Sequence, residues 1–294
     1  MRKGEIFTPC RDCIFHVDGD CAEGNGKTNE IDGCIETYYY DATVKELEDA
    51  KAKTVRTFVE RTIPKTIHYC WFGGKEMPET VKRCIFSWGQ VLPKSYTIKR
   101  WDETNYDVTK NKYIKDAYDS GNFAFVSDYA RFDILHQYGG VYLDTDVLLI
   151  KDITPLLECG AFGGLNNAGQ FASGLAVGGA AKMPIFREFM AEYENATFLT
   201  KGGEPKFDIN INKEEIVMER HGYKMALDEP QMVGGLIVYP KEYFCPYDPS
   251  KGETKITPNT FAIHQFTGTW MPDWMKDNLM KTNPKYKEHY DSIK

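Results

Sequence analysis

The segment from Phe123 to Ile150 constrains the fold most, because it joins a helical pattern to a strand pattern across two glycines. One face of the predicted helix carries side chains spaced four, three and four residues apart: Phe125, Tyr129, Phe132 and His136. Gly139 and Gly140 then supply a helix stop and a turn. The run that follows is almost entirely apolar, which is typical of a strand buried on both sides. The segment therefore predicts a helix, a tight turn and a core strand.

Two acids interrupt that apolar run. Asp144 and Asp146 are two residues apart within the predicted strand Val141–Ile150, so side-chain alternation places both on one face. A buried carboxylate is protonated, paired with a cation or bound to a metal. Hard oxygen ligands at this spacing suit Mg²⁺ or Mn²⁺, which share their coordination with substrate phosphates. Taken alone, the pair fits a solvated strand end equally well.

The predicted helix carries a second charged pair. Asp128 and Arg131 are three residues apart, so they are neighbours on its surface. In isolation this pattern favours an acid in a first helical turn after a capping Ser127, with Arg131 as its surface partner. The sequence GGVYLDTD follows closely and favours a site that includes both pairs.

The sequence AFVSDYARFDILHQYGGVYLDTD resembles the signature of the DXD-containing glycosyltransferases of family 32, which include bacterial capsule and lipopolysaccharide sugar transferases and yeast-type mannosyltransferases. It is also similar to the catalytic domain of the large clostridial glucosylating toxins. Two further pieces, IPKTIHYCWFGG from Ile63 and AIHQFTGTW ending at Trp270, resemble the start and end of the same domain.

The resemblance implies an enzyme, a metal-dependent, retaining hexosyltransferase. Its donor would be a nucleotide-diphosphate sugar, most simply UDP-linked, and its acceptor a hydroxyl of a glycan or glycolipid, as in capsule or lipopolysaccharide synthesis. No covalent nucleophile can be named, which favours front-face attack over double displacement. Two alternatives stay open, a nucleotide-sugar hydrolase or pyrophosphorylase using the same acids, and a sugar-nucleotide or carbohydrate-binding protein with little turnover.

The resemblance also implies residue roles. Asp144 and Asp146 would hold Mn²⁺ or Mg²⁺, with Asp144 also within reach of the donor's ribose. Asp128, kept ionised by Arg131, would hold the sugar hydroxyls together with that arginine. Two tryptophans and a histidine complete the set of predicted donor-site residues: Trp71 stacked on the base, Trp270 closing the site, and His264 as a third metal ligand or a structural histidine.

Alternating strand and helix patterns predict an α/β fold with a mainly parallel central sheet and helical additions. The resemblance implies that this nucleotide-binding fold is of the GT-A type. Strands are expected at Thr66–Phe72 and Tyr96–Trp101, where His68 reads as a satisfied core histidine. A first strand running into Gly73 and Gly74 is where open α/β sheets bind nucleotides. Helices are expected at residues 78–92, 112–120, 184–193 and 213–221. Asn167 and Ser173 are candidates for the acceptor region.

A cysteine cluster precedes the predicted catalytic domain. The spacing of Cys10, Cys13, Cys21 and Cys34 fits a structural Zn²⁺ site, although free thiols and disulfides stay open as alternatives. The predicted organisation is a Cys-rich N-terminal arm at residues 1–40, a connecting helix at 41–62 and a GT-A domain at 63–294.

Charge and hydropathy restrict the partners. The formal net charge is −7 and there is no long basic run, which argues against a nucleic-acid surface. No apolar run reaches the roughly 18 residues of a membrane span, and the N-terminus lacks a signal-peptide core. We therefore expect a cytoplasmic protein without a transmembrane segment, with peripheral membrane association compatible with a glycolipid acceptor.

Overall fold

The computed structural model describes residues 16–17, 20–21, 62–225, 228–248 and 251–293. The predicted connecting helix at 41–62 lies outside these residues except for its last position. Of the predicted zinc ligands Cys10, Cys13, Cys21 and Cys34, only the backbone of Cys21 is described, in a short hairpin of β1 (His16–Val17) and β2 (Asp20–Cys21). The zinc proposal and the division into an arm, a connecting helix and a domain stay predictions.

The fold is built on a seven-stranded sheet with the order β4-β3-β5-β8-β7-β10-β9. Its strands are β3 (Thr66–Cys70), β4 (Thr97–Trp101), β5 (Gly140–Tyr142), β7 (Ala161–Gly164), β8 (Val177–Gly179), β9 (Gln231–Val233) and β10 (Leu236–Tyr239). Strands β8 and β9 run against the other five, which point the same way. The predicted α/β fold with a mainly parallel central sheet is thereby confirmed.

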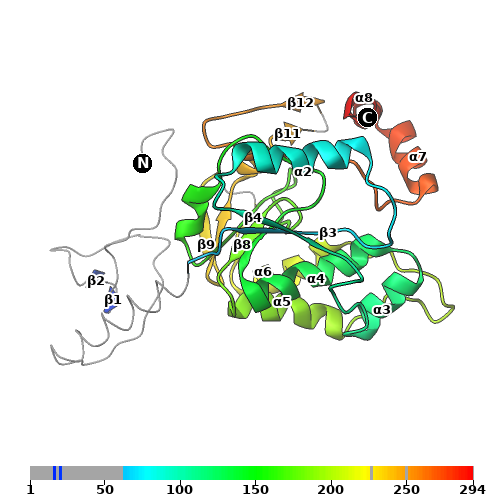
Figure 1. The fold of residues 1–294 in the computed structure, drawn as a ribbon, viewed down its shortest axis with the longest axis horizontal. Helices are drawn as coiled ribbons and strands as arrows, with labels where there is room; N and C mark the ends of the chain where they lie inside the picture. The colour runs from blue at the N-terminus through cyan, green and yellow to red at the C-terminus, as the bar shows by residue number, and fades with distance from the viewer. Residues whose placement is uncertain (1–15, 18–19, 22–61, 226–227, 249–250, 294) are drawn as a thin grey trace.

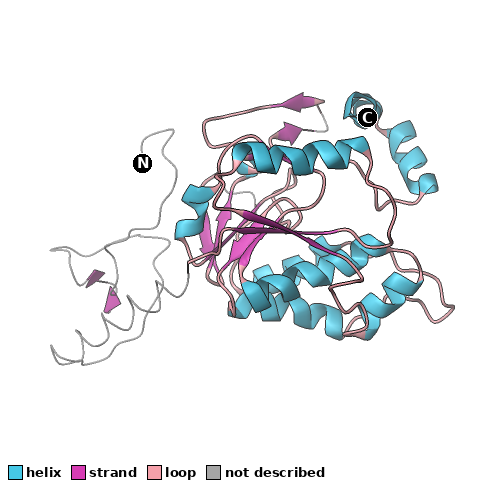
Figure 2. Ribbon diagram, viewed as in Figure 1, coloured by secondary structure: helices cyan, strands magenta, loops and turns pink. Residues whose placement is uncertain are grey.

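Helices cover both faces of this sheet (Figure 1). Helix α2 (Glu79–Val91) lies on one face, and α3 (Lys112–Asp119), α4 (Phe123–Tyr138), α5 (Pro184–Glu194) and α6 (Asn210–Arg220) lie on the other. The chain ends in α7 (Asp273–Thr282) and α8 (Pro284–Ile293), which pack against each other at one end of the sheet (Figure 2). None of the helices in the described ranges is both long and apolar enough to cross a membrane.

Smaller elements connect these layers. Strand β6 (Val147–Leu149) pairs antiparallel with β13 (Ala262–His264), and β11 (Tyr247–Asp248) pairs with β12 (Glu253–Thr254). Two 3₁₀ helices span Thr154–Glu158 and Lys241–Tyr243. The indole N–H of Trp88 on α2 donates to the carbonyl of Val147 at 2.8 Å. This bond fixes the β6 segment against α2, and β6 begins directly after the acid pair.

Helix α4 explains why its segment dominates the sequence. It is buried on nearly every side, with Phe125, Tyr129 and Phe132 at most 4% exposed, because it packs against β3 and between α3 and α5. Gly139 ends it at φ 65° and Gly140 begins β5 at φ 106°. A Cβ at Gly139 would lie 2.8 Å from the backbone nitrogen of Ala181, so the predicted helix stop also requires glycine for space.

The predicted strand Val141–Ile150 is wrong. The chain leaves the sheet after β5, turns through residues 143–146 and starts β6 in a different sheet. Asp144 and Asp146 therefore lie in a turn at the end of a strand and do not share a strand face. The physical reason is the cost of placing two carboxylates inside a strand buried on both sides, whereas at its carboxyl end they face a cavity.

Candidate active site

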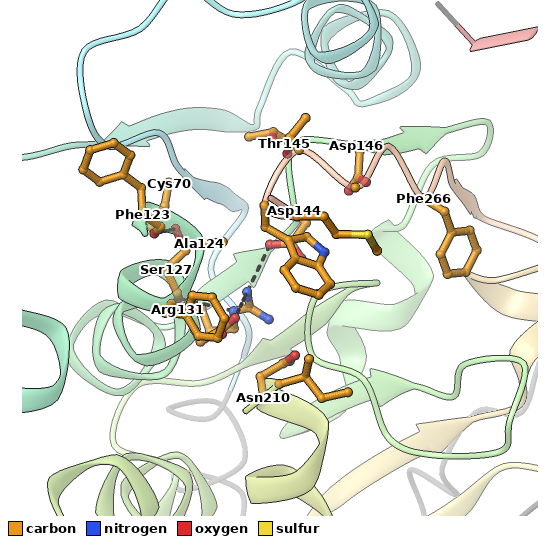
Figure 3. A pocket seen from close by; sticks show the side chains of 18 of the residues that line it. Cys70, Phe123, Ala124, Ser127, Arg131, Asp144, Thr145, Asp146, Asn210 and Phe266 are labelled. Carbon is orange, nitrogen blue, oxygen red and sulfur yellow. Dashed lines mark hydrogen bonds and ion pairs between the residues drawn. The ribbon is translucent and has the colours of Figure 1, made fainter. Parts of the chain in front are cut away.

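A cavity of about 600 Å³ opens beyond the carboxyl ends of β3 and β5. Its wall includes all seven donor-site residues expected from the sequence, namely Trp71, Asp128, Arg131, Asp144, Asp146, His264 and Trp270. They come from β3's exit, α4, the turn after β5, β13 and the segment before α7. Figure 3 shows Asp144 and Asp146 on one side of this cavity, Arg131 below them and Asn210 on the opposite wall. The fold brings together the residues the sequence singled out, while their roles stay predictions.

The turn that carries the acids is fixed through its backbone. The N–H of Asp144 donates to the carbonyl of Gly174 at 3.1 Å, and the N–H of Val147 donates to the carbonyl of Asp144 at 3.1 Å. A Cβ at Gly174 would lie 2.1 Å from Oδ2 of Asp144 and 3.4 Å from Nη1 of Arg131. Glycine is therefore needed at position 174 so that the Asp144 carboxylate can lie against this loop.

His264 reaches the acids because β13 pairs with β6. The register sets His264 opposite Val147, directly after the acid pair. Its Nε2 lies 3.2 Å from Oδ1 of Asp146. The other carboxylate oxygen, Oδ2, accepts hydrogen bonds from the backbone N–H of Thr267 at 3.1 Å and from its hydroxyl at 3.0 Å. Asp146 is thus held in one orientation by the last residue of β13, His264, and by Thr267, which follows that strand.

The contact between His264 and Asp146 shifts the pKa values of both residues. Burial pushes the pKa of Asp146 upward, but His264 and the Thr267 hydrogen bonds outweigh it, and the pKa falls to about 2. Burial alone would lower the pKa of His264, yet the neighbouring Asp146 carboxylate raises it above its usual value. Burial also raises the pKa of Asp144, against the opposing effect of Arg131. The imidazole of His264 and the carboxylate of Asp146 thus each favour the charged form of the other.

The donor set fits a divalent cation. Asp144, Asp146 and His264 each offer one ligand atom, and these atoms lie within 4.8 Å of one another. Two carboxylate oxygens and one imidazole nitrogen suit Mn²⁺, and a purely oxygen set would suit Mg²⁺. Nδ1 of His264 is buried and has no hydrogen-bond partner among the described residues. The fit to a cation therefore rests on the type and spacing of the donor atoms, since it is Nε2 of His264, and not Nδ1, that faces Asp146.

Arg131 links the acid turn to the rest of the cavity. Its Nη2 donates to Asp128 Oδ1 at 2.8 Å and to Asp144 Oδ1 at 3.2 Å, the second contact being the dashed line in Figure 3. Its Nη1 donates to the hydroxyl of Ser173 at 2.8 Å, and its guanidinium lies 5.0 Å from the ring centroid of Tyr142. The side chain is only 3% exposed. Because the guanidinium is buried and fixed, it holds the side chains of Asp128, Asp144 and Ser173 in defined orientations.

The protonation of Asp128 differs from the sequence-based expectation. Burial raises the pKa of Asp128 to about 7, and Arg131 opposes this rise without cancelling it. The expectation that Arg131 keeps Asp128 fully ionised therefore had the direction of the arginine's effect right and missed the larger effect of burial. Spacing along a helix reports which residues are neighbours, but not how deeply the pair is buried.

Aromatic side chains form much of the remaining wall. Trp71 is partly exposed at the exit of β3, and its indole N–H donates to the carbonyl of Lys75 at 2.7 Å, which fixes the ring's edge. Trp270 lies edge-to-face with Phe125 at a centroid distance of 6.3 Å. His68, by contrast, is 2% exposed and bonded on both nitrogens, to the indole N–H of Trp101 at 3.0 Å and to the carbonyl of Gly139 at 2.9 Å. It is the satisfied core histidine that the sequence predicted.

Some residues of the site were missed, or expected elsewhere. Gly174, Thr267 and Glu214 carry no motif, and Glu214 lies in a run, KEEIVMER, that reads as a solvated helix face. Helix α6 starts at Asn210 instead of the expected Lys213, which brings its first turn to the cavity. The candidate Ser173 is fully buried behind the wall, and Asn167 instead bonds the carbonyl of Tyr247. Among these residues, only Ser173 could have been singled out from the sequence, because its hydroxyl stands in a loop of small residues.

Comparisons with known proteins found similarity to glycosyltransferases and to capsular polysaccharide synthesis proteins. Residues 25–168 match the family model of capsular polysaccharide synthesis proteins. A mannosyltransferase also aligns, inositol phosphoceramide mannosyltransferase 3 of Schizosaccharomyces pombe, at 29% identity over 150 residues, covering 46% of this chain and 40% of that protein. The chain thus spans about two-fifths of this curated relative. Both matches are of the kinds that the sequence resemblance named, and that resemblance to glycosyltransferases is confirmed.

A solved structure, the PaToxG glycosyltransferase, superposes with a TM-score of 0.41 at 15% identity, covering 58% of this chain and 77% of that one.

Proposed function

We propose that the chain is a metal-dependent glycosyltransferase of the GT-A type that moves a hexose from a nucleotide-diphosphate sugar, UDP-linked in the simplest case, to a hydroxyl of a glycan or glycolipid. One observation carries the proposal. Asp144, Asp146 and His264 offer three ligand atoms that lie within 4.8 Å of one another, and they line the same cavity as Trp71 and Arg131. Arg131 is buried and bonded to two acids. A nucleotide sugar needs a group for each of its three parts, and this cavity offers them.

The diphosphate end would lie at Asp144, Asp146 and His264. A bound Mn²⁺ or Mg²⁺ there would neutralise the negative charge that develops on the leaving diphosphate. Thr267 holds the Asp146 carboxylate in place through two hydrogen bonds, and Gly174 fixes the backbone of Asp144. Because these orientations exist before a ligand arrives, little reorganisation is required on binding.

The sugar end would lie at Asp128 and Arg131. Arg131 donates hydrogen bonds to four residues, Ser127, Ser173, Asp128 and Asp144, so its guanidinium presents a fixed edge to the cavity. Asp128 lines the cavity and has one of its oxygens engaged by Arg131. A carboxyl group with one free oxygen is suited to hold sugar hydroxyls. Trp71, at the opposite end near β3's exit, would stack on the base.

Retention of anomeric configuration is proposed to occur by front-face attack. Among the described residues, the carboxyl groups that line the cavity are those of Asp128, Asp144 and Asp146. Each already bonds Arg131, Thr267 or His264. The second oxygen of Asp128 is assigned to the sugar hydroxyls, so no carboxylate is proposed as a covalent nucleophile. The acceptor oxygen would bond the anomeric carbon as the bond to the diphosphate breaks, and the acceptor's proton would pass to the departing phosphate oxygen.

A donor panel tests this function. The full chain with Mn²⁺ is mixed with a series of UDP- and GDP-sugars, and its melting temperature and the release of nucleoside diphosphate are followed. A ligand at 100 times its Kd contributes about 2.7 kcal/mol, which corresponds to a rise of roughly 5–10 °C for a domain of this size. We expect one donor to give such a rise only with metal present, and to be slowly hydrolysed.

Asp146→Ala is the matched variant. It should retain the fold by circular dichroism and lose both the metal-dependent shift and turnover. Full turnover in this variant would remove the metal assignment. If no sugar nucleotide is consumed or raises the wild-type melting temperature with Mn²⁺ present, the glycosyltransferase proposal is wrong.

A further inference from the structure

Glu214 is a fully buried acid whose bonds all lead toward the cavity, although it does not line the cavity itself. It is 0% exposed and lies on α6, one turn after Asn210. Its Oε2 accepts the backbone N–H of Ser173 at 3.0 Å, and its Oε1 accepts the hydroxyl of Ser173. The same Oε1 accepts the side-chain amide of Asn210 at 2.7 Å. Three donors from two different segments therefore converge on one carboxylate.

The first consequence concerns Ser173 and Arg131. Because the hydroxyl proton of Ser173 is directed to Glu214, its oxygen lone pairs face away and accept Nη1 of Arg131 at 2.8 Å. A hydroxyl has one proton, so the direction of both bonds is set by the carboxylate. Arg131 in turn bonds Asp128 and Asp144. The orientation of the Arg131 guanidinium thus depends on Glu214, which is linked to it through two successive hydrogen bonds at Ser173.

The second consequence concerns Asn210. A carboxylate only accepts hydrogen bonds, so the amide NH₂ of Asn210 must face Glu214 and its carbonyl oxygen must face away. Asn210 lines the cavity, and Figure 3 shows its oxygen directed into it, across from Arg131 and Asp144. Glu214 therefore also determines that Asn210 presents its carbonyl oxygen, a hydrogen-bond acceptor, to the cavity and not its NH₂ group.

We propose that Glu214 is a positioning residue of the sugar end of the cavity: it orders Arg131 through Ser173, and it turns the Asn210 carbonyl toward the bound sugar. The assignment of a sugar to this end rests on the proposed function. The bonds that define the positioning are present without any ligand. Removing the carboxylate's charge while keeping its shape should disturb at least one of these two walls of the cavity.

Glu214→Gln is the informative change because a glutamine amide has a single acceptor oxygen. The native carboxylate serves three donors with two oxygens, so one amide NH₂ must face a donor in the variant. If that NH₂ takes the place of Oε1, Asn210 reverses its amide or the hydroxyl of Ser173 turns and competes with Arg131. If it takes the place of Oε2, it faces the backbone N–H of Ser173 and displaces the loop that carries this hydroxyl. Ser173→Ala is a second variant that cuts only the Arg131 branch and leaves the backbone N–H of Ser173 bonded. Glu215→Gln is the control, since the neighbouring Glu215 bonds Gln170 at 2.8 Å and none of these groups.

The experiment compares nucleotide-sugar turnover with nucleoside-diphosphate binding in the full chain with Mn²⁺. We expect Glu214→Gln and Ser173→Ala each to lower turnover by about 10- to 100-fold, since misplacement by an ångström has effects of this size. Affinity for the nucleoside diphosphate, which lacks the sugar, should stay within about threefold of wild type. The double variant should lose less than the product of the single losses, because both act on Arg131. Glu215→Gln should match wild type.

Two results would overturn the proposal. One is wild-type turnover in Glu214→Gln, and the other is an equal loss of nucleoside-diphosphate binding, which would mean general damage to the fold. A ligand-free crystal structure of Glu214→Gln provides a test that does not need any donor. We expect the Arg131–Ser173 bond to be lost or the Asn210 amide to be reversed, and an unchanged network would refute the role even if the proposed function itself fails.

Discussion

Gly174→Ala probes the tightest contact of the candidate site. The added Cβ would lie 2.1 Å from Oδ2 of Asp144, whereas ordinary contacts begin at 3.4 Å. The Asp144 carboxylate must therefore retreat by roughly 1 Å or more, because the loop around position 174 is buried and close-packed. The Asp144 side chain is 30% exposed and lines the cavity, so its carboxylate has room to move away from residue 174. The backbone at Gly174 is not left-handed, and alanine adds no conformational strain.

The expected effects on stability and on activity therefore differ. Overpacking costs about 1–3 kcal/mol, and we expect the lower end because the displaced group can move into open space. A displacement of this size at a group that binds the metal should lower turnover by about 100-fold, equivalent to about 2.7 kcal/mol in the activation barrier. Both quantities can be measured on one preparation, by urea unfolding and by Mn²⁺-dependent nucleoside-diphosphate release.

Gly89→Ala is the control for this experiment. Gly89 lies in the last turn of α2, and an added Cβ there has no atom within 4 Å. Alanine should raise stability by at most about 0.5–1 kcal/mol, the gain for a position in the middle of a helix, and leave turnover unchanged. If Gly174→Ala retained wild-type turnover and wild-type Mn²⁺ affinity, the position of the Asp144 carboxylate would not matter for the reaction, and its assignment to the cation would be refuted.

Three further predictions concern other parts of the chain. Trp71→Ala should weaken nucleoside-diphosphate binding by about 1–3 kcal/mol, the usual worth of stacking a base on an aromatic ring, and an unchanged Kd by calorimetry would exclude Trp71 as the platform. Burial lowers the pKa of His68 to about 4, below the unfolded value of 6.5, so its contribution to stability is complete above pH 6.5 and is lost as pH falls toward 4. That loss should reach about 3 kcal/mol in urea titrations and be smaller in His68→Gln. Arg131→Met should cost about 3–5 kcal/mol at pH 8 and less at acidic pH, where the acids left unpaired are protonated; a pH-independent cost would contradict the buried ion pair.

Local patterns were enough to predict several elements and the residues they carry. The spacing of Phe125, Tyr129 and Phe132 and the stop at Gly139 predicted helix α4, since helix period and turn chemistry depend only on near neighbours. The apolar strand ending in Gly73 and Gly74 correctly placed Trp71 at an exit from the sheet. The same spacing made Asp128 and Arg131 neighbours, and they are bonded at 2.8 Å.

Long-range contacts decided what local patterns could not. The pairing of β13 with β6 brings His264 to Asp146, 118 residues earlier, and nothing in either segment alone requires it. The predicted strand through Asp144 failed because alternation cannot show where a chain leaves a sheet. Burial, which raises the pKa of Asp128 and makes Glu214 a convergence point, depends on several elements packing together. The sequence by itself determined which chemical groups this protein has and which neighbours they have along the chain. Only the tertiary structure decided which of them share a cavity, because that depends on contacts between residues far apart in the sequence.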